Sequence, residues 1–216
     1  MIEARLDWGR AARTGVPEAV YCEGKSLKQI NDIALEAHSK DQSMFFTRLS
    51  ADKAAGLDVA LDYDEGSATG VLGETPAPTD RGVAIVAAGT SDTRPAFEAL
   101  RTLEFGGVSA ATHIDVGVAG LWRLTEAAAE LQEKRIIIAC AGFEAALFSV
   151  LAGLVKAPVI AVPTSVGTGV AAGGQAALTS ALASCAPGVM TMNIDNGFGA
   201  ACAALKILNA FEGKTP

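Results

Sequence analysis

The residues best suited to chemistry in this sequence are a cysteine, a glutamate and several small polar loops. Cys185 lies in SCAPG, where a helical stretch gives way to an apolar run, and a thiolate at such a boundary can act as a nucleophile. Most cysteines are instead small buried hydrophobic residues, as we expect for Cys140 inside an apolar run and Cys202 inside a helical stretch. The local pattern around Cys185 leaves both interpretations open.

Glu144 is the one acid in the otherwise apolar segment AGFEAALFSVLAGL. This segment predicts a helix over about 144–154, with Glu144 in its first turn. A carboxylate there can simply satisfy free N–H groups and the helix dipole. It can also bind a metal ion or transfer a proton within a ligand site. Both interpretations remain open at this point.

A small polar loop, GTSD, follows the first apolar run of the second half of the chain and consists of Gly89, Thr90, Ser91 and Asp92. Small residues allow the backbone to approach an anion at a helix N-terminus. Ser91 and Asp92 can equally cap the helix that is expected to begin near Thr93. The loop is neither a Walker A motif nor a complete GxGxxG motif.

Further polar residues follow other apolar runs. The additional candidates for ligand contacts are Asp115, Arg123, Thr164, Ser165, Asp195 and Asn196. The acids and Asn196 serve equally well as caps, and Arg123 as a surface charge. We interpret His113 as a satisfied side chain within a strand.

The elements that must position these residues follow a repeating order of apolar run, glycine-bearing loop and helical stretch. The expected strands are GVAIVAA, VSAATHIDV, RIIIACA, PVIAVP and VMTMNI, and the expected helices are Thr93–Phe105, Gly120–Glu133, Glu144–Leu154, Gln175–Ser184 and Phe198–Phe211. Near-continuous apolar strands that alternate with helices are typical of a parallel sheet covered on both faces. The sequence therefore predicts an α/β fold, a three-layer αβα sandwich, with the loops gathered at the carboxyl edge of the sheet.

The first 80 residues differ in composition from the remainder. They carry much of the charge and end in the loop-like run GETPAPTDRG, so we expect an N-terminal extension over 1–80 and a catalytic domain over 81–216. In the extension, SLKQINDIALEAHSKD predicts a helix capped by Ser26, whereas SMFFTRLSAD and VALDYDEGSATGVLG predict short extended segments. No core-forming pattern is evident, which favours an extension packed on the main domain or on a neighbouring subunit.

Composition excludes several classes of function. The 216 residues are 50% hydrophobic and carry a net charge of −7, which argues against a nucleic-acid-binding protein. The N-terminus has no apolar segment typical of a secretion signal, and no apolar run is long enough to span a membrane. Four cysteines without metal-binding spacing predict reduced thiols in the cytoplasm, and two histidines make a multi-histidine metal site improbable.

Taken together, the motifs resemble a known family. GTSD, DVGVAGLWR, AGFEAALFSVLAGLVKAPVIAVPTSVG, SCAPGV and NIDNGFGAA, in this order, resemble the LarB proteins of nickel-pincer cofactor biosynthesis. The segments GVPEAVYCEGK and TRLSAD of the N-terminal part are also similar to that family. The second part of the chain is more distantly similar to the aminoimidazole ribonucleotide carboxylase PurE, whose sandwich is flavodoxin-like.

The LarB resemblance implies an enzyme that carboxylates the pyridinium ring of nicotinic acid adenine dinucleotide with CO2. Such an enzyme also hydrolyses the phosphoanhydride, so that its products are pyridinium-3,5-biscarboxylic acid mononucleotide and AMP. The resemblance further implies that Cys185 adds covalently to the ring, that Glu144 works with Mg2+, and that the protein is a cytoplasmic homo-octamer.

Some positions depart from the related families. PurE has a histidine where this chain has Ala146, which argues against the purine reaction. Trp122, Phe148 and Thr168 stand where histidine, proline and tyrosine are common in LarB, so details of the ligand pocket differ. Two alternatives remain, namely a non-catalytic LarB-like regulator of the circadian phase modifier type, and a PurE-like carboxylase of another heterocyclic nucleotide.

Overall fold

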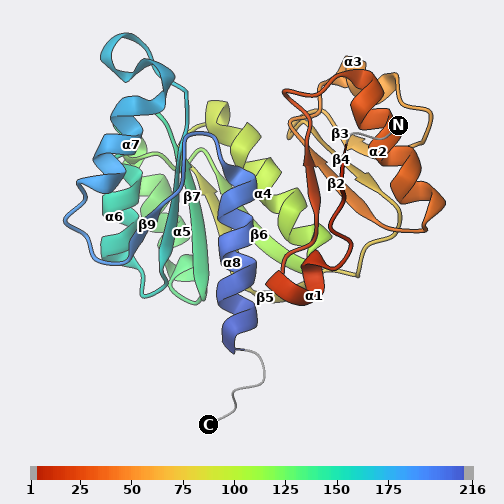
Figure 1. Ribbon diagram of the computed structural model, residues 1–216. Coiled ribbons are helices and arrows are strands. Elements are labelled where there is room, and N and C mark those ends of the chain that lie inside the picture. The colour runs from red at the N-terminus through yellow and green to blue at the C-terminus, as the bar shows by residue number, and fades with distance from the viewer. Residues whose placement is uncertain (1–3, 212–216) are drawn as a thin grey trace.

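The protein contains two β-sheets that follow one another along the chain, as a computed structural model describing residues 4–211 shows (Figure 1). The N-terminal sheet has the strand order β1-β2-β4-β3, in which only β1 and β2 are parallel. Its strands are β1 (Ala19–Tyr21), β2 (Met44–Thr47), β3 (Asp62–Asp64) and β4 (Thr69–Leu72). The C-terminal sheet has the order β6-β5-β7-β8-β9.

Every neighbouring pair of strands in the C-terminal sheet is parallel. The strands are β5 (Thr79–Ala87), β6 (Val108–Ile114), β7 (Ile136–Ala141), β8 (Val159–Pro163) and β9 (Val189–Thr191). The central strands β7 and β8 are buried along their whole length, as their apolar sequences predicted. The strand order is that of flavodoxin-like sheets, and the predicted α/β class is confirmed.

Helices cover both faces of this sheet and complete three layers (Figure 1). One face carries α4 (Thr93–Phe105) and α8 (Gly197–Phe211), and the other carries α5 (Leu121–Leu131), α6 (Leu147–Leu154) and α7 (Gln175–Leu182). The short 3-10 helices are η1 (Thr90–Asp92), η2 (Val118–Gly120) and η3 (Gly169–Gly174). Alternate residues of β5 enter different cores, since Ile85 packs toward α4 and α8 and Val86 toward α5 and α6. Within residues 4–211, no helix combines the length and the apolar character that crossing a membrane requires.

The helix predicted to start at Glu144 is shorter than expected. Phe143 and Ala145 have φ values of 53° and 51°, which lie in the left-handed region and are incompatible with a right-handed helix. Helix α6 therefore begins only at Leu147, and Glu144 lies in the preceding turn. The prediction that Glu144 occupies the first helical turn was wrong.

The N-terminal part has a core of its own, contrary to the sequence prediction. It contains α1 (Arg10–Thr14), α2 (Leu27–Ser39) and α3 (Ala51–Ala55), and Ser26 caps α2 as predicted. The buried residues of this core include Val20, Cys22, Ile30, Ile33, Ala34, Ala37, Met44, Phe46, Leu49 and Leu72. Strand β2 is buried on both faces, so its sequence MFFT has no polar alternation to reveal which face forms the core.

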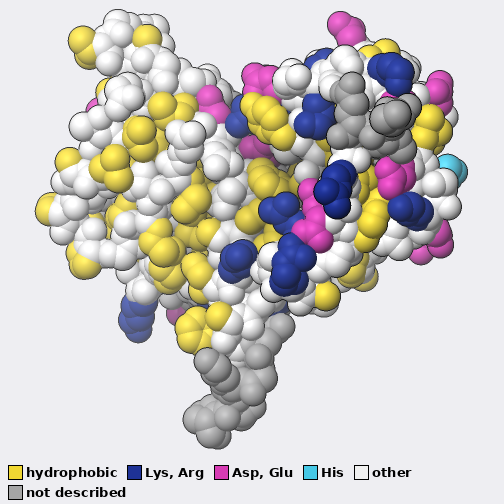
Figure 2. Space-filling model, in the orientation of Figure 1, with side chains coloured by type: hydrophobic (Ala, Val, Ile, Leu, Met, Phe, Trp, Pro, Cys, Tyr) yellow, Lys and Arg dark blue, Asp and Glu magenta, His cyan; other side chains and the backbone are white. Residues whose placement is uncertain are grey.

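An aromatic contact joins the two parts. Phe45 on β2 packs against Phe105 of α4 and Phe198 of α8, with ring centroids 5.4 and 6.1 Å apart. The N-terminal part therefore packs on the same two helices that cover one face of the C-terminal sheet. Charged side chains gather over the N-terminal part, whereas hydrophobic ones are spread over the C-terminal part (Figure 2).

Helices α4 and α8 approach each other so closely that one position admits only glycine. A Cβ atom on Gly197 would lie 2.0 Å from the carbonyl oxygen of Pro95, which is backbone and cannot move aside locally. Gly197→Ala is therefore expected to lower the free energy of unfolding by about 1–3 kcal/mol. Denaturant unfolding measures this loss, and Gly153→Ala in α6 is the matched control.

A Cβ atom on Gly153 would meet nothing within 4 Å, and α6 is an ordinary helix there. This control should therefore raise stability by about 0.5–1 kcal/mol, because alanine restricts the unfolded chain more than glycine does. Equal effects of the two substitutions would contradict a specific close approach at Gly197.

Candidate active site

The carboxyl ends of the five parallel strands form a rim, as the sequence predicted. In a sheet of this strand order, the loops after β5 and β7 diverge to opposite faces and leave a crevice between them. A pocket of about 330 Å3 lies there, lined by the loops that follow β5, β6, β7 and β8, and we call it the switch-point pocket. Gly89, Ser91, Asp92 and Glu144, all predicted as site residues, lie in its wall.

Asp92 closes the GTSD loop and does not cap α4. Its buried carboxylate accepts a hydrogen bond from the backbone N–H of Gly89 at 2.9 Å and another from the hydroxyl of Thr164. No side-chain cap is present at the start of α4, so the structure does not support the alternative in which Asp92 caps this helix. Burial raises the pKa of Asp92, and the two hydrogen bonds partly oppose this shift. Asp92 thus ties the loop after β5 to the end of β8.

Glu144 presents an exposed carboxylate to the same pocket. Within residues 4–211, no hydrogen bond or ion pair engages its side chain. The backbone on either side is strained, and Asp115 and Asp195 in two other rim loops also have positive φ values. Such strain is commonly concentrated at functional sites, because the surrounding structure must hold it in place. The carboxylate of Glu144 is therefore available to a ligand.

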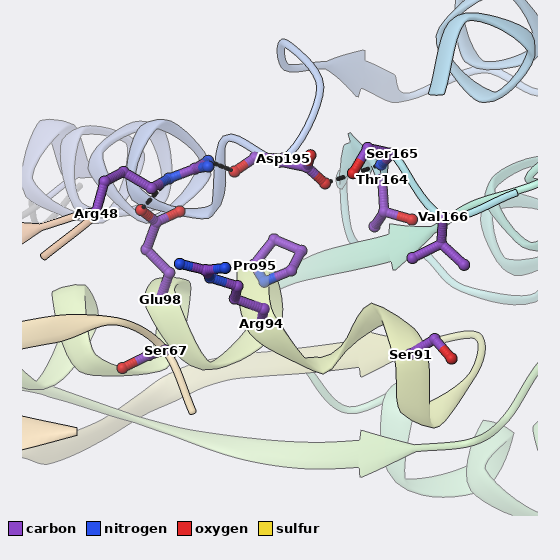
Figure 3. Close-up of a pocket in the computed structure, with 10 residues that line it drawn as sticks. All are labelled: Arg48, Ser67, Ser91, Arg94, Pro95, Glu98, Thr164, Ser165, Val166 and Asp195. Atoms are coloured by element: carbon purple, nitrogen blue, oxygen red, sulfur yellow. Dashed lines mark hydrogen bonds and ion pairs between the residues drawn. The ribbon is translucent and has the colours of Figure 1, made fainter. Parts of the chain in front are cut away.

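A smaller pocket of about 160 Å3 lies where the rim meets the N-terminal part, and we call it the junction pocket (Figure 3). The predicted residues Ser91, Thr164, Ser165 and Asp195 line it. One carboxylate oxygen of Asp195 accepts a hydrogen bond from the backbone N–H of Ser165 at 2.9 Å.

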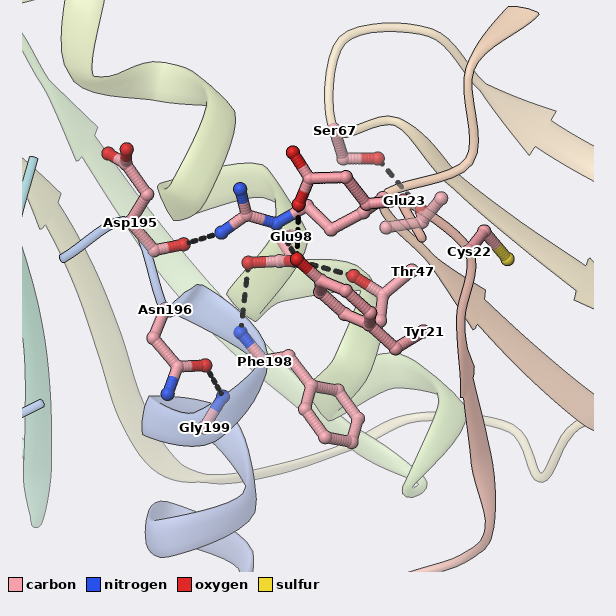
Figure 4. A network of polar contacts seen from close by, with 12 residues as sticks. Tyr21, Cys22, Glu23, Thr47, Ser67, Glu98, Asp195, Asn196, Phe198 and Gly199 are labelled. Carbon is pink, nitrogen blue, oxygen red and sulfur yellow. Dashed lines mark hydrogen bonds and ion pairs between the residues drawn. The ribbon is translucent and has the colours of Figure 1, made fainter. Parts of the chain in front are cut away.

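Sequence reasoning missed three charged residues of the junction pocket, namely Arg48, Arg94 and Glu98. Arg48 donates to the main-chain carbonyl of Asp195 and, through Nε, to Glu98 at 3.1 Å. Figure 4 shows Glu98 at the centre of a network that spans both parts of the chain. The one signal in the sequence was Glu98, a charged residue on the apolar face of the predicted helix. Since charged side chains are rarely buried without a partner, its position indicates a nearby cation.

Besides Cys185, four predicted site residues lie outside the two rim pockets. Asp115 and Arg123 form an ion pair with each other in a shallow hollow beside the edge strand β6. Asn196 accepts a hydrogen bond from the backbone N–H of Gly199 at 2.8 Å, which is a capping role at α8. Thr90 belongs to η1.

Cys185 does not line the switch-point pocket. Helix α7 ends at Leu182, so Cys185 lies in the turn that leads into β9, before the strand rather than after it. The neighbouring Ser184 hydroxyl is 2.8 Å from the hydroxyl of Ser149 on α6, which holds the start of this turn against the helix layer. The Cys185 side chain itself is exposed. A single chain therefore does not place Cys185 and Glu144 in one pocket.

The four cysteines differ strongly in their environments. Burial raises the pKa of Cys22 to about 12 and that of Cys202 to about 11, and it also raises the pKa of Cys140. Since the thiolate is the reactive form, iodoacetamide at pH 8 should modify Cys185 at least about a hundredfold faster than the others. Peptide mass spectrometry of the folded protein measures these rates. Comparable rates at Cys202 would contradict the prediction, and equal labelling after unfolding is the control.

The described side chains do not form a complete metal site by themselves. Within the described residues 4–211, no three His, Cys, Asp or Glu side chains are grouped so that they could hold a metal ion. Mg2+ is often held by one or two carboxylates together with substrate phosphates. Glu144 fits that arrangement as a single protein ligand in the presence of a diphosphate.

Comparison with known proteins agrees with this architecture. The profile of the AIR carboxylase family matches residues 82–215, and that of the LarB/PurE-like N-terminal domain matches residues 1–72. An uncharacterised protein of Methanocaldococcus jannaschii is 38% identical over 208 residues, which cover 91% of this chain and 80% of that protein. These matches show that the chain belongs to the AIR carboxylase family and carries the LarB/PurE-like N-terminal domain, as its LarB motifs predicted.

Proposed function

We propose that this protein carboxylates the pyridinium ring of nicotinic acid adenine dinucleotide and hydrolyses its phosphoanhydride. The products are pyridinium-3,5-biscarboxylic acid mononucleotide, a precursor of the nickel-pincer cofactor, and AMP. The observation that carries this proposal is the switch-point pocket of a carboxylase-like chain, in which Glu144 is exposed and Ala146 replaces the histidine of PurE. The pocket favours a carboxylation other than the purine one.

The proposed reaction needs a reversible nucleophile. A pyridinium ring is electron-poor and does not attack CO2, but addition of a thiolate at the carbon para to nitrogen gives a dihydropyridine. Its enamine carbon forms the new bond to CO2. Loss of the proton from that carbon and expulsion of the thiolate then restore the aromatic ring and the free cysteine. Cys185 is the exposed thiol among the four cysteines and is the proposed nucleophile.

Glu144 can serve the same reaction in two ways. Its carboxylate, unpartnered within residues 4–211, can accept the proton released from the ring. It can also hold Mg2+, which would supply positive charge to the diphosphate of the substrate during hydrolysis. The small residues of the pocket wall, such as Gly89, Gly142 and Ala145, leave room for a flat ring beside this carboxylate.

The proposed site is completed by a second copy of the chain. Cys185 is exposed but lies away from the switch-point pocket, so a neighbouring copy is the natural source of the thiol. The C-terminal part exposes large apolar side chains that an assembly would cover, including Leu121, Trp122, Phe143, Val170 and Leu182. The homo-octamer implied by the family is the proposed form of this assembly.

Incubation of the purified protein with nicotinic acid adenine dinucleotide, bicarbonate and Mg2+ tests the proposal. Mass spectrometry should detect AMP and a mononucleotide that is heavier than nicotinic acid mononucleotide by the mass of CO2. With 13C-bicarbonate, the added carbon should carry the label. Aminoimidazole ribonucleotide should remain unchanged under the same conditions. Absence of labelled product from folded protein would refute the proposal, and ligand binding without turnover would favour a regulatory role.

A further inference from the structure

The junction pocket and the switch-point pocket are neighbours. Ser91 and Val166 line both, so a ligand can extend from one into the other past these two residues. At about 160 Å3, the junction pocket is smaller than typical small-molecule sites of roughly 300–1,000 Å3. It therefore suits one part of a larger ligand whose remainder occupies the switch-point pocket.

Two arginines line the junction pocket, but only one of them is engaged. Arg48 binds Glu98 and the carbonyl of Asp195, and Figure 3 shows these links. Arg94 is exposed, and no hydrogen bond or ion pair joins its guanidinium to any residue within 4–211. A guanidinium offers paired N–H donors that match a phosphate. Arg94 is thus the cation that this pocket offers to a ligand.

The other polar groups of the pocket specify more than a bare phosphate. One carboxylate oxygen of Asp195 accepts a hydrogen bond from the backbone N–H of Ser165, and the other oxygen remains available as an acceptor. The hydroxyls of Ser91 and Ser165 make no hydrogen bond within the described part of the chain. A carboxylate beside the cation repels a free phosphate ion but accepts hydrogen bonds from sugar hydroxyls. This combination matches a ribose that carries a phosphate.

We propose that the junction pocket binds the ribose-phosphate of the adenylate half of the substrate, with Arg94 as its phosphate contact. This inference rests on the proposed function, because it assumes that Glu144 faces the ring to be carboxylated in the neighbouring pocket. Arg48 and Ser67 come from the N-terminal part and form one wall of the junction pocket. The N-terminal part then contributes directly to the substrate site.

Titration calorimetry with AMP tests this assignment. Arg94→Ala should weaken AMP binding at least about tenfold, because a charge-assisted contact to phosphate is lost, and Arg94→Lys should lose less. Binding of nicotinic acid mononucleotide should change less than about threefold in the same variants, since that half occupies the other pocket. The control is Arg101→Ala. Arg101 lies on the same helix as Arg94, but it pairs with Asp62 and does not line the junction pocket.

Each outcome bears on the assignment separately from the proposed function. Unchanged AMP affinity in Arg94→Ala, or an equal loss for both mononucleotides, would overturn it, as would an equal effect of Arg101→Ala. If AMP binding depends on Arg94 but no carboxylated product forms, only the proposed reaction fails. If product forms and Arg94→Ala changes neither the KM for the dinucleotide nor the AMP affinity, only the subsite assignment fails.

Discussion

Co-expression of Cys185→Ala chains with Glu144→Gln chains is expected to restore about a quarter of the wild-type carboxylation activity, whereas each variant alone is expected to be inactive. The physical reason is the position of the two side chains. Glu144 lies in the turn after β7 and lines the switch-point pocket, whereas Cys185 lies in the turn before β9 and does not. If each site takes Glu144 from one copy and Cys185 from another, random assembly leaves some sites with both residues intact.

The matched control places both substitutions in one chain and co-expresses that chain with the wild type. A site shared between copies predicts about a quarter of full activity in this mixture as well. A site within one chain predicts about half of full activity here and none in the first mixture. The pair of experiments therefore distinguishes the two arrangements without a structure of the assembly.

Cys185→Ala alone should abolish carboxylation and leave the fold unchanged, because the exposed side chain makes no buried contact that alanine would lose. Binding of AMP should also persist in this variant, since Cys185 lines neither rim pocket. Retained carboxylation in Cys185→Ala would contradict the covalent role, whatever the result of the mixing experiment.

The C-terminal sheet could be predicted from sequence because its signals are local. The run RIIIACA lies in a strand that is buried on both faces, and the helix predicted over Thr93–Phe105 has those bounds in the structure. Burial on both faces demands continuous apolar residues, and each helix must present an apolar stripe to the sheet. Once the strands are parallel, their loops must meet at one edge, so the rim itself was also predictable.

The turn that carries Glu144 could not be predicted, because distant contacts impose it. The backbone N–H of Phe143 donates to the carbonyl of Val166 at 2.8 Å, and Gly142 packs directly against the same carbonyl. These contacts come from the loop after β8 and hold Phe143 and Ala145 at positive φ. Local composition favoured a helix there, and tertiary contacts overrode it.

The position of Cys185 shows a different limit. The sequence correctly placed Cys185 before the last strand. The resemblance to LarB implied catalytic roles for Cys185 and Glu144 but did not predict where the two residues lie relative to each other. A single chain fixes which end of a strand each loop occupies. It does not fix which surfaces meet in an assembly. The relation between the two residues therefore belongs to the quaternary structure, which local sequence patterns do not encode.

The junction between the two parts depends on a buried ion pair, and Arg48→Met is expected to lower the free energy of unfolding by about 3 kcal/mol. The Glu98 side chain is only 3% exposed and accepts hydrogen bonds from Arg48, from the Thr47 hydroxyl and from the backbone N–H of Phe198 at 3.1 Å. Removal of Arg48 leaves this carboxylate buried without its compensating charge. Denaturant unfolding followed by far-UV circular dichroism measures the loss.

A second ion pair between the same two parts provides the control. Arg101 of α4 pairs with Asp62 of β3, but the Asp62 side chain is 70% exposed and can be hydrated when its partner is removed. Arg101→Met should therefore cost no more than about 1 kcal/mol. Equal losses in the two variants would show that burial of Glu98 is not the decisive difference.

A double-mutant cycle separates the ion pair from the other contacts of Arg48. If the cost of Arg48→Met comes from the unpaired carboxylate, the double variant Arg48→Met/Glu98→Gln should lose less stability than the two single variants together. The expected difference is about 1–3 kcal/mol. Without such coupling, the loss would instead reflect the packing of the Arg48 stem. Because Arg48 also holds the carbonyl of Asp195, a coupled pair means that the stability of the junction and the shape of the neighbouring pocket depend on the same contact.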